Sequence, residues 1–366
     1  MRLHHFCLGA LLAIAGPWPL SHADDLGDLF SDYKRALQTG DAEEVAGAAA
    51  LVYEYAAANL PESSKSRIAA TINYGKALSQ RGQFEQAEKL LSSSVDMLEK
   101  IHGEGGIELV DPLLEQVKNR LRQKRKTKDR GIVYRRLAHR ALKITRDTRG
   151  EGSLLYGVVN LELGRAALDQ IGDLYAKKYL KTAHRLFARL PEAEGYYRSM
   201  SDFYLGKYHL SANQYGSALP YLESALVQVD RGEQPDGQLE LTTRAFLVEA
   251  YEEVGAQEKS IEQCRAIGKA RPFGPDQDPQ PLFRRTPVYP QQALRAGQQG
   301  YAVVRFTISD TGMPTDIETV EWQGSEHFGR AAEAYIEKLR YAPAFENGKP
   351  VDTLGHQTKV SFNIAR

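Results

Sequence analysis

The chain has 366 residues, with 47 basic and 47 acidic side chains, so its formal net charge is zero. Hydrophobic residues make up 42% and charged residues 26%, as in an ordinary soluble globular protein. A chain of this length exceeds what one hydrophobic core normally serves, so we expect two or more domains. Because the charges balance, the composition gives no general electrostatic reason to expect nucleic-acid binding.

The first 23 residues have the features of a secretory signal peptide. Arg2 supplies the positive charge, residues 6–15 form an apolar core, and Ser21-His22-Ala23 is a small-residue cleavage site. The alternative is an uncleaved membrane anchor. A helix of about ten residues, however, spans only about 15 Å, half of a hydrocarbon layer about 30 Å thick. We therefore predict cleavage after Ala23, a periplasmic location, and no membrane span after cleavage.

Residues 24–271 carry apolar side chains at helical spacing almost without interruption, which predicts an all-α region. Small and aromatic residues also recur along it in a common register, which indicates an internal repeat. The clearest copies cover residues 71–98, 202–229 and 244–272, a weaker copy surrounds Tyr179, Ala183 and Phe187, and a degenerate copy covers residues 26–58. In the first two copies, Gly75 and Gly206 occupy the first helix, where the two helices of a pair would touch.

This repeat resembles the tetratricopeptide (TPR) family, with about five to six helix pairs. In that family each pair buries one face on the next, which produces a curved solenoid with a concave groove. The alternative is an irregular helical bundle, and the three copies in register favour the solenoid. The resemblance leaves the partner of the groove unknown.

Residues 118–143 contain twelve Lys or Arg residues and a single acidic one, Asp129. The candidate anion-binding patch comprises Arg120, Arg122, Lys124, Arg125 and Lys126. Such a patch could hold a lipid head group, a cell-wall polymer or an acidic partner, while a solvated helix face is the simpler interpretation. No aromatic residue interleaves its basic core, which argues against single-stranded nucleic acid.

Residues 272–281 are rich in proline, which disfavours helix and favours an extended, semi-rigid spacer. We predict a domain boundary here, with the helical domain at residues 24–271 and a second domain at residues 282–366. We expect the two domains to fold independently.

The second domain has the pattern of strands. Apolar residues occupy every second position from Ala302 to Ile308, and Asp310-Thr311-Gly312 then predicts a turn. Further predicted elements are a strand at residues 315–323, a helix at 328–341, a turn at 347–350 and a final strand at 358–364.

Ordered motifs in this segment resemble the C-terminal domain of the TonB family of energy transducers. The motifs are Pro287–Ala293, Gly300–Ile308, Asp310–Met313, Leu339–Ala344, Asn347–Val351 and Val360–Ile364. Ala302, Leu339 and Tyr341 replace the valine, tryptophan and phenylalanine usual in the family. The resemblance implies a small α+β domain with a three-stranded antiparallel sheet and two helices. The expected architecture is therefore an all-α TPR-like solenoid followed by this domain.

The resemblance also implies a way of binding, in which a partner peptide pairs with the final strand as an added strand. The residues to which it assigns this role are Tyr289, Pro290, Lys359, Val360, Ser361 and Phe362. The implied function is a protein–protein adaptor in TonB-dependent transport, with outer-membrane receptors or other envelope proteins as partners. The alternative is an envelope scaffold or assembly protein that uses the domain only for docking, without energy transduction. The short spacer and the absence of a family-type anchor leave both open.

Motifs for catalysis are not found. The sequence has no G-x-S-x-G, H-E-x-x-H or C-x-x-C, and the histidines that follow the predicted signal peptide are scattered. We therefore expect no enzymatic activity, no metal site and no cofactor. A third hypothesis is an exported enzyme whose catalytic residues are distant in the sequence and come together in the fold. Cys264 lies in a helical apolar pattern, which favours a buried role over a reactive one.

Overall fold

The computed structural model describes residues 20–123, 130–168, 174–230, 237–270 and 279–364. The predicted signal peptide and the predicted spacer lie largely outside these residues, so both stay predictions. The chain forms two compact units, residues 1–189 and residues 190–366.

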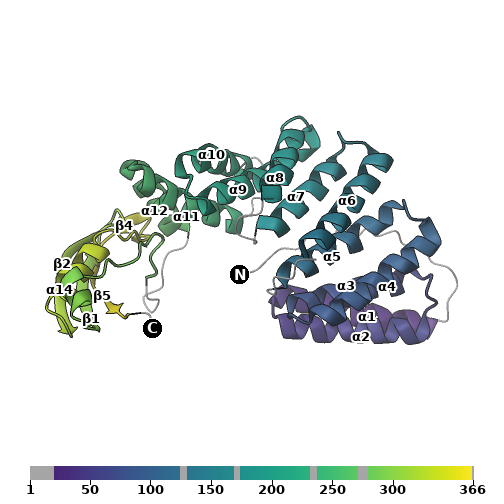
Figure 1. Cartoon of the computed structure of the whole chain (residues 1–366), viewed down its shortest axis with the longest axis horizontal. Coiled ribbons are helices and arrows are strands. Elements are labelled where there is room, and N and C mark those ends of the chain that lie inside the picture. The colour runs from purple at the N-terminus through teal and green to yellow at the C-terminus, as the bar shows by residue number, and fades with distance from the viewer. Residues whose placement is uncertain (1–19, 124–129, 169–173, 231–236, 271–278, 365–366) are drawn as a thin grey trace. The chain divides into compact units, whose positions relative to one another are not determined.

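The first unit is built from helices that each pack on the next along the chain (Figure 1). They are α1 (Leu20–Thr39), α2 (Ala42–Asn59), α3 (Lys65–Gln80), α4 (Phe84–His102), α5 (Val110–Arg122), α6 (Arg130–Arg149), α7 (Leu154–Leu168) and α8 (Leu174–Phe187). Helix α5 also contacts α3 and α7, the first helices of the neighbouring pairs. This stacking of helix pairs is TPR-like, as the repeat predicted.

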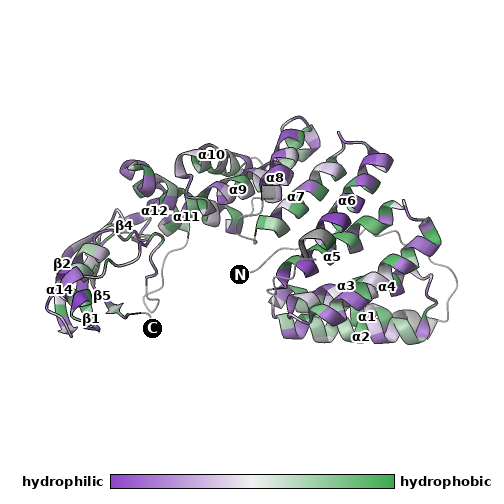
Figure 2. Ribbon diagram, viewed as in Figure 1, coloured by the Kyte–Doolittle hydropathy of each residue, from purple (hydrophilic) through white to green (hydrophobic). Residues whose placement is uncertain are grey.

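Glycines allow the close approach within these pairs. A Cβ atom at Gly75 would lie 3.0 Å from the Leu91 side chain, and one at Gly164 would lie 2.6 Å from that of Leu180. The helices are amphipathic, with apolar and polar surfaces on each (Figure 2). The apolar faces bury residues such as Leu91, Leu109 and Leu113, which are fully inaccessible to solvent. Burial of these faces supplies the main stabilisation of the pairs.

The second unit begins with two further helix pairs, α9 (Tyr196–Ser211) with α10 (Tyr215–Asp230) and α11 (Gly237–Val254) with α12 (Gln257–Ala270). Gly206 of α9 faces Leu222 of α10, where an added Cβ would lie only 2.5 Å away. The pairs predicted at residues 71–98, 202–229 and 244–272 are thus confirmed over their described residues.

A small α+β domain completes the second unit. Its elements are α13 (Gln291–Arg295), β1 (Gly300–Ile308), β2 (Pro314–Gln323), α14 (His327–Ile336), β3 (Ala344–Glu346), β4 (Lys349–Val351) and β5 (Thr353–Phe362). Strands β2, β1 and β5 form an antiparallel sheet in that order, and β3 pairs with β4 in a separate hairpin. The predicted three-stranded sheet with two helices is confirmed.

The alternation in β1 defines the core of this domain. Ala302, Val304, Phe306 and Ile308 are each at most 1% exposed. They pack against α14 and β5 in one cluster that includes Phe328 and Phe362. The turn predicted at residues 310–312 is also present, since Gly312 has a φ of +79° and its added Cβ would meet the Tyr341 carbonyl oxygen at 2.0 Å.

The helix predicted over residues 328–341 ends earlier, at Ile336. After it, the Lys338 and Leu339 N–H groups donate to carbonyls three residues back, and the Tyr341 N–H donates to the Gly312 carbonyl at 2.8 Å. This distant acceptor draws the chain out of the helix, while Leu339 and Tyr341 remain buried. A tertiary hydrogen bond therefore overrides the local helical pattern.

Helices α11 and α12 pack directly on the α+β domain. Val248, Cys264 and Ile267 form one apolar cluster with Phe283 and Ala342. The Cys264 side chain is fully buried, as predicted, and burial raises the pKa of its thiol to about 12, with the Glu252 carboxylate adding to the effect. The thiol therefore stays protonated and unreactive in the folded chain.

Ion pairs border this cluster. The Arg340 Nε donates to Glu252 Oε1 at 2.8 Å, and each of these two side chains is only 9% exposed. The Arg265 guanidinium donates to the Asp310 carbonyl oxygen and carboxylate, both at 3.1 Å. Backbones also meet closely, because an added Cβ at Gly268 would lie 2.4 Å from the Pro343 carbonyl oxygen. The last helix pair and the α+β domain are therefore closely packed within one unit.

Candidate functional site

Strand β5 forms one edge of the three-stranded sheet. It pairs with β1 along one side, from Gly300 opposite Phe362 to Ile308 opposite Thr353. No strand in the described part of the chain pairs with its other side. An edge of this kind presents main-chain N–H and C=O groups that an incoming peptide strand can satisfy.

The side chains of β5 fix its register. Val360 and Phe362 are 3% and 2% exposed and point into the core, whereas Lys359 and Ser361 are exposed. The Phe362 ring stacks on Phe328 at a centroid distance of 4.6 Å. A slip by one residue would expose both buried side chains, so the edge is held in a single register.

Tyr289 and Pro290 lie beside the end of β5. The Tyr289 ring meets Phe328 and Phe362 edge-on, at centroid distances of 5.9 and 5.6 Å, and its hydroxyl donates to the Gln298 carbonyl. Pro290 is the N-cap residue of α13. Of the six residues predicted for partner binding, four lie on β5, Tyr289 packs against Phe362, and Pro290 begins α13.

A ladder of polar side chains crosses the exposed face of the sheet. The Lys359 ammonium of β5 lies 3.5 Å from the centroid of the Tyr301 ring of β1. The Tyr301 hydroxyl in turn donates to Glu321 Oε1 of β2 at 2.6 Å, which raises the pKa of this tyrosine. Sequence reasoning missed Tyr301 and Glu321, because only the register of the three strands brings them next to Lys359.

The residues predicted as an anion-binding patch make internal contacts where they are described. Arg120 pairs with Glu88 at 2.8 Å, and the Arg122 guanidinium donates to Ser79 Oγ at 3.0 Å. Lys124, Arg125 and Lys126 lie outside the described residues. The patch therefore remains a prediction, and its first two members have partners on neighbouring helices.

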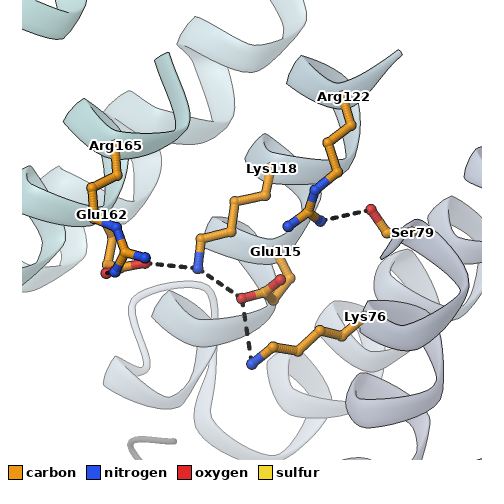
Figure 3. Close-up of polar contacts among 7 residues, drawn as sticks. All are labelled: Lys76, Ser79, Glu115, Lys118, Arg122, Glu162 and Arg165. Carbon is orange, nitrogen blue, oxygen red and sulfur yellow. Dashed lines mark hydrogen bonds and ion pairs between the residues drawn. The ribbon is translucent and has the colours of Figure 1, made fainter. Parts of the chain in front are cut away.

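Lys118, in the same basic segment, belongs to a buried network that joins α3, α5 and α7 (Figure 3). Its ammonium lies 2.9 Å from both Glu115 Oε1 and Glu162 Oε2. Glu115 is only 2% exposed and also faces Lys76 at 3.7 Å, while Glu162 accepts from Arg165 at 2.7 Å. Ionised side chains thus bridge three successive helix pairs.

The charges of this network shift its titration. Burial alone would raise the pKa of Glu162, but the cations of Lys118 and Arg165 outweigh it and lower that pKa to about 2. Burial would also raise the pKa of Glu115. The cations of Lys118 and Lys76 outweigh this effect, so the pKa of Glu115 is lowered as well. Both carboxylates stay ionised at neutral pH.

We expect the first unit to lose stability between pH 4.5 and pH 2. Because the pKa of Glu162 is lower in the folded chain than its ordinary value of 4.5, its contribution is complete above pH 4.5 and is lost as the pH falls toward 2. The contribution is roughly 3 kcal/mol. Hydrogen exchange of α5 and α7 should reveal it, with a Glu162→Gln variant as the comparison. If the difference in stability between the unmodified protein and the Glu162→Gln variant stayed constant over this pH range, the result would contradict the expectation.

The described residues contain no group of three or more His, Cys, Asp or Glu side chains that could hold a metal ion. Within the same residues, no helix has the length and hydropathy needed to cross a membrane.

The described residues thus form a helical-repeat region followed by a small α+β domain whose sheet has an open edge. Comparison with known proteins identifies the family of the α+β domain. Residues 285–364 match the family described as Gram-negative bacterial TonB protein C-terminal. These residues therefore form a TonB-family C-terminal domain, preceded by a TPR-like helical region.

Individual relatives cover parts of the chain. Protein TonB of Pseudomonas aeruginosa is 37% identical over 76 residues, which are 21% of this chain and 22% of that protein. The chain thus spans about a fifth of the length of this curated relative. A solved structure of the tonb2 protein from Vibrio anguillarum is 36% identical, covering 26% of this chain and 91% of that one, with a TM-score of 0.21. A putative kinesin light chain with TPR-like repeats from Podosopora anserina is 16% identical, covering 69% and 97%, with a TM-score of 0.38.

Proposed function

We propose that this protein is a periplasmic adaptor of TonB-dependent transport, which binds peptide segments of outer-membrane receptors as an added strand along β5. The observation that carries the proposal is the position of β5 at the edge of the sheet, where β1 is its one neighbouring strand among the described residues. The family match of residues 285–364 supports the choice of receptor peptides as the ligand. The TPR-like helices provide a second surface, which holds another envelope protein.

Main-chain hydrogen bonds give such a complex its affinity, and the fixed register of β5 gives it a defined position. In an antiparallel strand, successive residues direct their N–H and C=O groups alternately toward the paired neighbour and toward the open side. Thr358 and Ser361 differ in this parity, because they lie three positions apart, which is an odd number. One of the two N–H groups faces β1, and the other faces the open edge.

We expect proline at these two positions to have opposite effects. Of Thr358→Pro and Ser361→Pro, the variant whose N–H faces the open edge should stay folded and bind a receptor-derived peptide about five-fold more weakly or worse, since one main-chain hydrogen bond contributes about 1 kcal/mol. The other variant should lose a bond to β1 and unfold more easily. Calorimetric titration with the peptide and thermal unfolding of both variants provide the measurements.

Lys349→Ala is the matched control, because this exposed residue lies on β4, outside the three-stranded sheet. Its affinity should equal that of the unmodified protein. Unchanged affinity in the folded proline variant would contradict strand addition. Failure of the unmodified protein to bind any receptor peptide would instead favour an envelope scaffold that does not take part in energy transduction.

A further inference from the structure

A cleft of about 630 Å³ lies in the second unit, between the segment 285–292 and helix α14. One wall is the chain that leads into α13, including Arg285, Thr286 and Val288. The other wall is a continuous face on and just after α14, formed by Arg330, Ala331, Ala334, Tyr335 and Lys338. The volume falls within the range of roughly 300–1,000 Å³ typical of ligand pockets. Pro290 also lines the cleft, so the cleft adjoins the residues predicted for the β5 site, but no residue of β5 itself takes part in it.

The charge of the cleft is positive. Arg285, Arg330 and Lys338 line it, together with His327, and no lining residue is acidic. Arg285 pairs with Glu253 at 3.0 Å. Arg330 and Lys338 are exposed and have no ion-pair partner among the residues that the structure describes. Two cations are therefore available to an anionic ligand.

Apolar surface lies between these cations. Val288 is 75% exposed on one wall, which is unusual for a branched aliphatic residue. Ala331, Ala334 and the half-buried ring of Tyr335 form the opposite wall. A ligand that fits both properties alternates negative charge with apolar side chains.

The backbone of the cleft distinguishes a peptide from a lipid. Phe283 is bridged to Arg340, and α13 begins at Gln291, but residues 284–288 make no main-chain hydrogen bond within the described chain. Pro287 has no N–H, but the C=O groups of this non-helical segment and the N–H groups of its other, exposed residues can pair with another main chain. A peptide satisfies these groups, whereas a lipid headgroup and its acyl chains leave most of them without a partner.

We propose that this cleft binds an acidic, extended peptide segment of a partner protein. The peptide main chain pairs with residues 284–288, its carboxylates contact Arg330 and Lys338, and its apolar side chains pack against Val288, Ala334 and Tyr335. The site uses no residue of β5 and adjoins the β5 site only at Pro290.

The test uses the full chain and a short fluorescein-labelled peptide of alternating Asp and Leu residues, followed by fluorescence anisotropy. The double variant Arg330→Glu, Lys338→Glu should bind the peptide at least about ten-fold more weakly, because two attractions become repulsions. Ala334→Trp, which fills the cleft from an exposed position, should weaken binding similarly. Lys349→Glu changes an exposed cation elsewhere in the domain and should leave the affinity unchanged.

Circular dichroism verifies that each variant is folded. Equal affinity of the double variant, or equal binding of a Lys-Leu peptide, would overturn the proposal. Loss of Asp-Leu binding only in the folded β5 proline variant would assign the peptide to β5 and would likewise overturn it. Binding to phosphatidylglycerol vesicles without binding to the peptide would replace the peptide with a lipid surface.

Discussion

Replacing Arg340 with methionine should lower the free energy of unfolding of the second unit by about 3–5 kcal/mol. The substitution leaves the Glu252 carboxylate, which is 9% exposed, without its partner. It also removes the donor that Arg340 Nη1 provides to the carbonyls of Glu337 and Leu339, at 3.1 and 2.7 Å. A buried charge without a partner costs far more than the pair contributes, so the loss is expected to be large.

The double variant Arg340→Met, Glu252→Met separates these effects. With both charges replaced by apolar side chains, most of the lost stability should return. Arg295→Met, on the exposed surface of α13, should change stability by less than about 0.5 kcal/mol. Urea unfolding followed by hydrogen exchange of α11, α12 and β1 measures the effect. A loss below about 1 kcal/mol for Arg340→Met would show that the two parts of the unit are only loosely packed.

The second large effect is expected in the first unit, at Lys118. The Lys118→Met variant keeps the shape of the side chain but removes the cation that Glu115 and Glu162 share (Figure 3). Glu115, at 2% exposure, then keeps Lys76 at 3.7 Å as its nearest cation among the described residues. We expect a loss of about 3 kcal/mol in the free energy of unfolding.

Lys143→Met is the matched control in the same unit, because Lys143 is 58% exposed and pairs with Asp147 on the surface. An exposed pair contributes at most about 1 kcal/mol. Hydrogen exchange of α3, α5 and α7 in urea compares the two variants. Equal stability of Lys118→Met and Lys143→Met would mean that the network does not hold the helix pairs together.

Much of the fold could be predicted because it depends on local pattern. The alternation from Ala302 to Ile308 has period two, and it gave the strand and its buried face correctly. Gly75 and Gly206 indicated helix contacts. A Cβ atom at either position would come within 3.0 Å of the Leu91 or Leu222 side chain on the second helix of the pair. In each case the residues that decide the structure are close together in the sequence.

The rest depends on partners that are distant in the sequence. The end of α14 is decided by the hydrogen bond from Tyr341 to Gly312, and no local feature at Ile336 indicates it. Arg340 and Glu252 are separated by 88 residues, and their pairing follows from the packing of α11 on the α+β domain. Lys118 was interpreted as part of a basic segment, because one acidic partner, Glu115, precedes that segment and the other, Glu162, lies on another helix pair. The cleft beside α14 likewise combines two segments that the sequence keeps apart.

The packing of α11 and α12 on the α+β domain has a consequence for avidity. Because these elements form one compact unit, the surface of α11 and α12 and the proposed peptide edge of β5 have a set spacing. A partner that carries both epitopes then makes its second contact at an effective concentration in the millimolar range rather than at its bulk concentration. A partner held by two such weak contacts dissociates slowly as a whole. A competitor can nevertheless displace each contact separately.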